Sequence, residues 1–333
     1  MKRLIGTIIA LFLFLVIAFF STLQPTTFSN AKGVPTIGIL QLTTHPALDA
    51  IHKGIIAGLE KEGYVPGKSV NIDFQNAEAD QSNLKSMSDK FNNENVNLMI
   101  GIATPSAQSL ANVTKKTPII LGAVTDPKGS GLVSNNQKPG NNITGVSDQA
   151  PIKAQLALMK ELMPNMKTVG VLYTSSDDSA TKQYQQFKSA AIKSGLEVKS
   201  ATITSTNDVD QVSQSLVASV DAVYVPTDNT VASSMQTLVK NATQAKIPIF
   251  PAVDTMVKNG GLATISINQY DLGVATGKMA AAVLSGKSVP ATTPINFVKK
   301  GDLIINLKTA KALNITIPQA LIDQAKNKGE LIK

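Results

Sequence analysis

Polar side chains gather where short apolar runs of this 333-residue sequence give way to helix-starting residues. Thr104 and Ser106 flank Pro105 directly after the apolar run at 99–103. A capping hydroxyl followed by proline favours a helix start, and the exposed N–H groups of a helix start can hold an anion without a cationic side chain. Thr104 and Ser106 are therefore our first candidates for binding a carboxylate. The alternative is that they only cap and begin their helix.

Three aspartates are candidates for meeting an ammonium group. Asp228 and Asp254 each follow a proline-containing strand end, and we expect one of them to face a ligand. Asp148 lies where the first half of the chain passes to the second, so it could be a hinge residue or a ligand contact. An aspartate in such a place can also satisfy N–H groups of its own turn, and the sequence leaves this choice open. Thr125, at another strand end, could add a hydroxyl or belong to an ordinary turn.

An apolar ligand group would need rings or aliphatic surface beside these polar groups. His45, Tyr173, Phe250 and Tyr270 lie near expected strand ends or connections, although each could equally serve packing. The full set of expected ligand contacts is Gln41, His45, Thr104, Ser106, Thr125, Asp148, Tyr173, Ser175, Asp228, Asn229, Asp254 and Tyr270. A carboxylate site, an acid for an ammonium group and an apolar site together fit a zwitterionic ligand.

The residue types that the sequence lacks exclude several chemistries. There is no cysteine, and Arg3 is the only arginine, so thiol nucleophiles, cysteine-ligated metals and guanidinium grips on anions are not available. The spacing of His45 and His52 does not match the two-histidine pattern of zinc sites. The Gly-x-Ser-x-Gly elbow and the Walker phosphate loop are also missing. We therefore expect no metal, no cofactor and no enzymatic activity.

The elements expected to position the candidate residues occur twice, because residues 36–126 resemble residues 168–254 in spacing and type. The matched segments are 36–40 with 168–172, 54–63 with 187–195, 98–104 with 222–227, and 117–120 with 246–250. Short β-branched runs that alternate with longer amphipathic segments are typical of βαβ units in a parallel sheet. We expect two lobes with a cleft between them, and helix starts near Thr44, Thr104, Ser176 and Asp228 that face this cleft.

The first residues are typical of an export signal. Met1, Lys2 and Arg3 precede an apolar stretch at 4–20, which is also at the short limit for crossing a bilayer. We expect residues 1–33 to be a signal peptide or an N-terminal membrane anchor, with the anchor favoured. The net charge of +8 comes almost wholly from scattered lysines. It indicates a solvated surface, with attraction to an anionic cell envelope as the alternative. We expect no nucleic-acid binding.

Several sequence blocks together resemble the ABC transporter substrate-binding proteins, specifically the branch described as tryptophan-binding in low-GC Gram-positive bacteria. The blocks are ILQLTTHPALDAIHKG at 39–54, GIATPSAQSL at 101–110, GAVTDPKGSGLV at 122–133, NNITGVSD at 141–148 and YVPTDNTV at 224–231. The resemblance implies a type I periplasmic-binding-protein-like fold with two doubly wound parallel-sheet lobes and three crossovers. It also implies closure around an amino acid and delivery to a membrane permease powered by an ATPase. Gram-positive members are commonly lipoproteins, and without cysteine the tether here would be the stretch at 4–20.

From this resemblance we expect the first lobe at 34–147 and 269–290, and the second at 148–268 and 291–333. The expected function is extracytoplasmic capture of L-tryptophan or another aromatic amino acid by a monomer at the outer face of the cytoplasmic membrane. A sensor domain for a signalling receptor would use the same cleft and is the alternative. A regulator of the LacI type shares the two lobes but needs a DNA-reading helix-turn-helix where the apolar leader lies. An exported enzyme is a third possibility.

Overall fold

The computed structural model of the chain describes residues 33–298 and 301–333. Pro35–Lys333 forms one compact unit. The expected signal peptide or membrane anchor lies, except for its last residue, outside the described residues. Across the two described ranges, no helix combines the length and the apolar character that are needed to cross a membrane.

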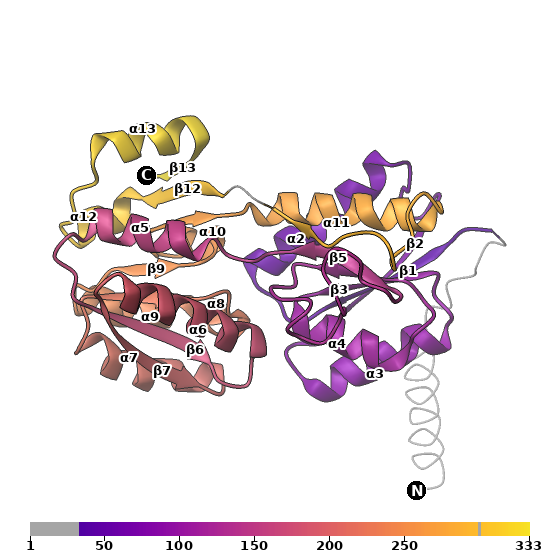
Figure 1. The fold of residues 1–333 in the computed structure, drawn as a ribbon, viewed down its shortest axis with the longest axis horizontal. Helices are drawn as coiled ribbons and strands as arrows, with labels where there is room; N and C mark the ends of the chain where they lie inside the picture. Colours follow the sequence, from indigo (N-terminus) through magenta and orange to yellow (C-terminus); the bar gives the residue numbers. More distant parts are fainter. Residues whose placement is uncertain (1–32, 299–300) are drawn as a thin grey trace, which may run out of the picture. The chain divides into compact units, whose positions relative to one another are not determined.

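The first sheet is six-stranded, wholly parallel, and ordered β11-β5-β4-β3-β1-β2. Its strands are β1 (Thr36–Gln41), β2 (Asn71–Asn76), β3 (Leu98–Ile102), β4 (Ile119–Gly122), β5 (Ile143–Ser147) and β11 (Asn296–Phe297). β3, β4 and β5 are buried along their whole length. This explains the continuous apolar runs of β3 and β4, whereas β5 also carries Thr144 and Ser147. Helices cover both faces (Figure 1), with α2 (Pro46–Lys61) and α11 (Gln269–Leu284) on one and α3 (Gln81–Asn93) and α4 (Thr104–Val113) on the other.

The second lobe repeats the strand order of the first. Its four-stranded parallel sheet is ordered β7-β6-β8-β9, matching β2-β1-β3-β4. The strands are β6 (Thr168–Thr174), β7 (Glu197–Ile203), β8 (Ala222–Val225) and β9 (Ile249–Pro251). The helices are α5 (Ile152–Leu162), α6 (Asp178–Lys193), α7 (Val209–Val217), α8 (Asn229–Ser233), α9 (Met235–Gln244) and α10 (Asp254–Lys258). The duplication expected from the sequence is therefore confirmed at the level of topology.

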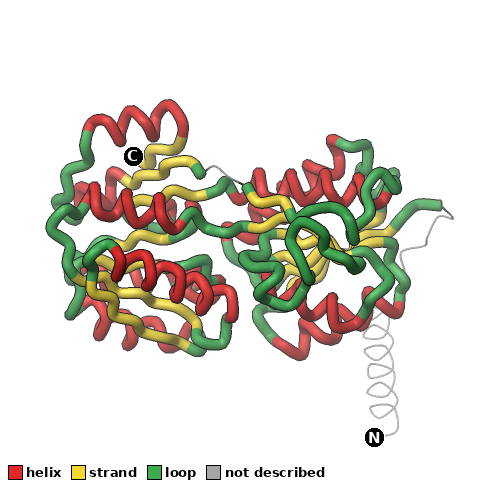
Figure 2. The backbone as a smooth tube through the Cα atoms, viewed as in Figure 1, coloured by secondary structure: helices red, strands yellow, loops and turns green. Residues whose placement is uncertain are grey.

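A three-stranded sheet of order β10-β12-β13 completes the second lobe (Figure 2). It consists of β10 (Ala263–Ser266), β12 (Asp302–Asn306) and β13 (Gly329–Ile332), and β10 pairs antiparallel with β12. Helices α12 (Leu307–Ala312) and α13 (Gln319–Lys328) belong to the same part of the chain. This sheet is not part of the parallel pattern that the sequence suggests, because its strands come from residues outside the duplicated segments.

The chain passes between the lobes three times. It crosses after β5, returns after β10 to form α11, and leaves the first sheet for good after β11. β11 pairs with β5, so the first sheet includes residues beyond the boundary at 290 that we expect from the sequence. Each lobe has its own hydrophobic core. The fully buried aromatic rings are Phe91 in the first core and Phe187 and Tyr224 in the second.

Gln155 ties the two interlobe connections on the second-lobe side together. Its amide donates to the carbonyls of Ala252 and Ile265 at 3.1 and 2.9 Å, and it accepts from the Tyr224 hydroxyl at 2.8 Å. Gln155 lies on α5, which follows the first crossover, while Ile265 lies on β10, which precedes the second. Buried polar groups that are fully hydrogen-bonded rigidify their surroundings. These bonds therefore fix α5, β8 and β10 relative to one another within the second lobe.

Glycines let α2 and α11 approach so closely that their backbones touch. A Cβ placed on Gly273 would lie 2.1 Å from the Ile51 carbonyl oxygen, and one on Gly277 would lie 2.2 Å from the Ile55 carbonyl oxygen. Gly54 and Gly58 on α2 meet α11 in the same way. Both helices begin at the cavity described below, so this packing sets how the start of one is placed relative to the other.

Candidate functional site

A small, largely enclosed cavity of about 20 Å³ lies where residues of the two lobes meet. Its apolar lining is aliphatic and consists of Ala47, Leu48, Ile51, Ala103, Ala123, Ala232, Val253 and Met256. Its polar lining consists of His45, Thr104, Thr125, Asp148, Ser179, Thr227, Asp228, Asn229, Thr255 and Gln269. The titratable groups among these are two aspartates and one histidine, with no lysine or arginine. A ligand carboxylate in this cavity would have to be held by N–H and hydroxyl groups.

The cavity lies at the switch points of both parallel sheets. Strand order reverses between β1 and β3 in the first lobe and between β6 and β8 in the second, and open α/β sheets bind ligands beyond the carboxyl ends of the strands at such points. The starts of α2, α4, α6 and α8 all contribute residues to the lining. The expectation that these helix starts face one cleft is thereby confirmed.

The structure brings part of the expected residue set together in this cavity, namely His45, Thr104, Thr125, Asp148, Asp228 and Asn229. The others do not line it: Gln41, Ser106, Tyr173, Ser175, Asp254 and Tyr270. Tyr173 stacks on Tyr184 with ring centroids 4.6 Å apart, and Tyr270 is 42% exposed. Gln41 donates to Asp49 at 2.8 Å and to the Thr43 carbonyl at 2.9 Å. Ser175 bonds to Ile203, while Asp254 keeps a buried Oδ1 without a hydrogen bond.

The start of α4 differs from the other expected helix starts because no side chain caps it. His45 caps α2, Asp177 caps α6 and Asp228 caps α8, whereas the residue before α4 is Ala103. The first N–H groups of a helix have no acceptor in a preceding turn, so this start is suited to an external anion. Directly behind it, the Ser106 hydroxyl is fully buried and has no hydrogen-bond partner.

Backbone strain is concentrated beside the same helix start. Ala103 has φ 76° and Ala123 has φ 59°, a left-handed conformation that costs a non-glycine residue roughly 1 to 3 kcal/mol. Both residues line the cavity at the carboxyl ends of β3 and β4. Strain of this kind persists where the surrounding structure imposes it, and it clusters at ligand sites.

Two buried aspartates line the cavity, but their bonding differs. Asp228 accepts from the N–H and the hydroxyl of Thr174 and from the N–H of Val231. Asp148 accepts from the Thr125 hydroxyl at 2.9 Å. Burial raises the pKa of both carboxyls to about 6, against the effect of these hydrogen bonds. Asp228 is therefore committed to its own lobe, whereas Asp148 keeps capacity for a further partner.

His45 and Asn229 contact each other across the cavity. The Nδ1 atom of His45 accepts from the Ala47 N–H at 3.3 Å, so the proton of the neutral ring is on Nε2 and donates to Asn229 Oδ1 at 2.9 Å. Burial lowers the pKa of His45 below its ordinary value, which keeps the ring neutral at physiological pH. The pair joins the start of α2 in the first lobe to the start of α8 in the second.

Several lining residues were missed by the sequence reasoning. Leu48, Ile51 and Met256 look like ordinary buried positions of amphipathic helices, and nothing local marks them as cavity residues. Gln269 follows Asn268, which caps α11. A cap residue after a strand was the signal used elsewhere, and it would have identified this helix start as well.

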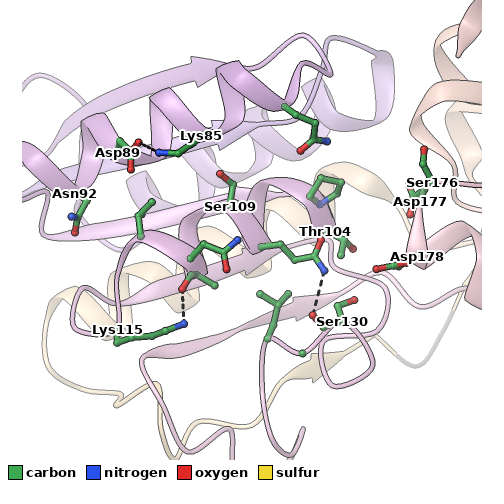
Figure 3. A pocket seen from close by; sticks show the side chains of 18 residues that line it. Lys85, Asp89, Asn92, Thr104, Ser109, Lys115, Ser130, Ser176, Asp177 and Asp178 are labelled. Carbon is green, nitrogen blue, oxygen red and sulfur yellow. Dashed lines mark hydrogen bonds and ion pairs between the residues drawn. The ribbon is translucent and has the colours of Figure 1, made fainter. Parts of the chain in front are cut away.

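A larger polar groove lies outside the cavity and shares Thr104 with it (Figure 3). Lys85 and Asp89 pair within α3 at 2.6 Å, and Lys115 donates to the Ala111 carbonyl. Asp177 and Asp178 of the second lobe lie at its far side. We place the functional site in the smaller cavity because that space is enclosed, lies at the switch points and combines aliphatic surface with buried polar groups.

Comparison with known proteins identifies relatives of the chain over most of its length. The family model described as ABC transporter substrate binding protein matches residues 36–328. A tyrosine-binding protein of Clostridioides difficile (strain R20291) is 41% identical over 287 residues, which are 86% of this chain and 83% of that protein.

Two solved structures add the fold. The ABC domain from Streptococcus pneumoniae in complex with L-Trp is 46% identical, with a TM-score of 0.86 over 90% of this chain and 100% of that one. A ligand-free, open substrate-binding protein of Clostridium difficile is 41% identical, with a TM-score of 0.70 over 90% of this chain and 99% of that one. The two-lobe, type I periplasmic-binding-protein-like architecture is thus shared with these structures.

Proposed function

The chain belongs to the family of ABC transporter substrate-binding proteins, and from that premise we propose that its cavity captures an aromatic α-amino acid. L-tryptophan is the first candidate and L-tyrosine the second, because two relatives of 46% and 41% identity are described with these ligands. The observation that carries the proposal is the presence of an uncapped helix start and a carboxyl with spare capacity in one enclosed cavity.

The ligand carboxylate is assigned to the start of α4. The N–H groups of Thr104 and Ser106 and the Thr104 hydroxyl would donate to the carboxylate oxygens, while Pro105 between them has no N–H. The helix dipole favours the negative charge. Thr104 lines the cavity, which supports this assignment. No cationic side chain is needed, in agreement with a cavity that has none among its lining residues.

The ligand ammonium group is assigned to Asp148. Asp228 already accepts several protein hydrogen bonds, and Asp254 does not line the cavity. An ammonium group beside a buried carboxylate offsets part of the cost of removing that charge from water. The ligand side chain would then lie on the aliphatic surface of Leu48, Ile51 and Met256.

We further propose that the protein delivers its ligand to a membrane permease and its ATPase, without catalysis. The family operates outside the cytoplasm, so the chain would act at the outer face of the membrane, tethered by residues 1–33 or secreted. We propose a monomer, since one chain supplies both sides of the cavity.

Titration calorimetry with L-tryptophan is expected to show one saturable site with a Kd of about 1 μM, which corresponds to roughly −8 kcal/mol. The protein has no tryptophan, so the fluorescence of the bound ligand is also measured without background. Tryptamine lacks the carboxylate and 3-indolepropionate lacks the ammonium group. Each is expected to bind at least about 30-fold more weakly, because each leaves one buried polar site unpaired.

L-tyrosine and L-leucine serve as the comparison ligands in this experiment. Tighter binding of L-tyrosine than of L-tryptophan would change the preferred ligand and leave the class intact. Equal affinity for L-tryptophan and tryptamine would contradict the assignment of the carboxylate to α4, and no binding of any amino acid would contradict the proposed function.

Affinity is expected to fall in acid, because the ammonium group requires an ionised Asp148. Burial raises the pKa of this carboxyl to about 6. Kd should therefore be constant above pH 7 and about tenfold higher at pH 5, as the free protein takes up a proton that must leave on binding. Asp228 has a similarly raised pKa but is not assigned to the ligand. A pH-independent Kd in the Asp148→Asn variant would support the assignment to Asp148, whereas a pH-independent Kd in the wild type would contradict it.

A further inference from the structure

A chain of hydrogen bonds runs from the second lobe to Asp148 through two side chains that meet between the lobes. The backbone N–H of Thr227 donates to Gln183 Oε1 at 3.1 Å. Gln183 Nε2 donates to Thr125 Oγ1 at 3.4 Å, and Thr125 Oγ1 donates to Asp148 Oδ1 at 2.9 Å. Gln183 is fully buried on α6, although it is not among the residues that line the cavity.

The direction of every bond in this chain is fixed. A hydroxyl has one proton, and Thr125 gives it to Asp148, so toward Gln183 it can only accept. Gln183 accepts from Thr227 through its oxygen and therefore turns its amide group toward Thr125. Hydrogen bonds that follow one another in the same direction polarise each other. The negative charge on Asp148 consequently strengthens the bond between Thr125 and Gln183.

The hydrogen bond between Gln183 and Thr125 is the one in this series that joins α6 to the first lobe. Thr227 and Gln183 belong to the second lobe, whereas Thr125 follows β4 of the first. When the lobes separate, the Gln183–Thr125 bond must break, and the Thr227–Gln183 bond can remain. Closure is thus linked to the charge state of Asp148 through a residue on the middle of a helix.

We propose that Gln183 is a positioning residue that couples recognition of the ligand ammonium group to closure of the lobes. The inference rests on the proposed function, because that function assigns the ammonium group to Asp148. The ligand ammonium group offsets the cost of burying the ionised Asp148 when the lobes meet. It thereby stabilises the closed state, in which the Gln183–Thr125 bond is formed. The contact between His45 and Asn229 is a second interlobe bond, and it lets the lobes close when Gln183 is replaced.

The test is a double-mutant cycle with Gln183→Leu and Thr125→Val, measured by calorimetry and stopped-flow fluorescence with L-tryptophan. Gln183→Leu is expected to raise Kd roughly three- to tenfold, the effect of one neutral hydrogen bond. The rise should appear in the dissociation rate, since the bond forms only once the lobes have met. The Kd of the double variant should lie within about twofold of the Kd of Thr125→Val, because Thr125→Val alone already removes the Gln183–Thr125 hydrogen bond.

Gln185→Leu is the matched control, since Gln185 is exposed on the same helix and its replacement should leave Kd unchanged. Gln183→Met, which is closer in shape to glutamine, is measured beside Gln183→Leu, and urea unfolding shows that both variants are folded. Effects of Gln183→Leu and Thr125→Val that multiply in the double variant would overturn the inference, as would a wild-type dissociation rate in both Gln183 variants. A wild-type protein that binds no amino acid would instead refute the proposed function.

Discussion

Asp148→Asn is expected to raise the Kd for L-tryptophan roughly 30-fold to 4,000-fold. Asparagine keeps the size of the side chain and an oxygen that accepts from Thr125, but it removes the negative charge. The ligand ammonium group would then be buried without its counter-charge, which costs about 2 to 5 kcal/mol. Titration calorimetry at pH 7.5, a condition in which the wild-type carboxyl is ionised, measures the difference.

The stability of the same variant separates loss of binding from loss of folding. Burial raises the folded-state pKa of Asp148 above its ordinary value to about 6. The protonated carboxyl therefore contributes to the stability of the folded protein. This contribution is fully present below the unfolded-state pKa and is lost as the pH rises through 6, because the buried carboxyl then becomes charged. The unliganded Asp148→Asn protein should accordingly melt no lower than the unliganded wild type at pH 7.5.

Asp228→Asn is the comparison, because Asp228 accepts its hydrogen bonds from Thr174 and Val231 within one lobe. Only one of the two terminal atoms of an asparagine side chain can accept hydrogen bonds, whereas both carboxyl oxygens of Asp228 accept them. This variant should therefore melt at a lower temperature than the wild type. If Asp148→Asn bound L-tryptophan normally while a folded Asp228→Asn protein did not, the ammonium group would have to be assigned to Asp228.

Gly277→Ala is expected to destabilise the protein by about 3 kcal/mol or more, at the upper end of overpacking costs. The new methyl group would lie 2.2 Å from the Ile55 carbonyl oxygen and 2.9 Å from the Leu59 nitrogen. Both are backbone atoms, which cannot rotate away as a side chain does. The gain of about 1 kcal/mol in helix propensity from glycine to alanine does not offset this. Urea unfolding monitored by circular dichroism gives the free energy.

Lys278→Ala is the control for this measurement, since Lys278 is exposed on the same helix and its replacement should change stability by less than about 0.5 kcal/mol. Gly277→Ala should also weaken ligand binding, because a displaced α2 moves Leu48 and Ile51 in the cavity wall. A Gly277→Ala protein as stable as the control would show that the two helices can separate freely.

The sequence predicted those features of the fold that depend on local pattern. The paired apolar runs at β1 and β6 became interior strands of two sheets that share the order of four strands, because both copies carry the same alternation of strand and helix. The sheet formed by β10, β12 and β13 was not predicted. β13 pairs with β12 over only a few residues at the end of the chain, and short strands outside a repeat leave no periodic signal.

Part of the candidate site was predicted from polar residues that follow strand ends. Thr104 and Asp148 stand next to strand ends and were identified by type and place. Gln183 lies inside a helix, where its sequence neighbours give no hint that it reaches the other lobe. The choice among the aspartates also depends on three-dimensional contacts, since only the structure shows that Asp228 is already occupied by its own lobe.

The uncapped start of α4 bears on how specificity can change during evolution. A point mutation exchanges a side chain but leaves the main-chain N–H in place, unless it introduces proline. A protein that binds the part common to all its ligands through main-chain N–H groups therefore keeps this contact while neighbouring aliphatic side chains are substituted. Descendants of one ancestor could in this way come to prefer an indole or a phenol, with no intermediate that had lost its hold on amino acids.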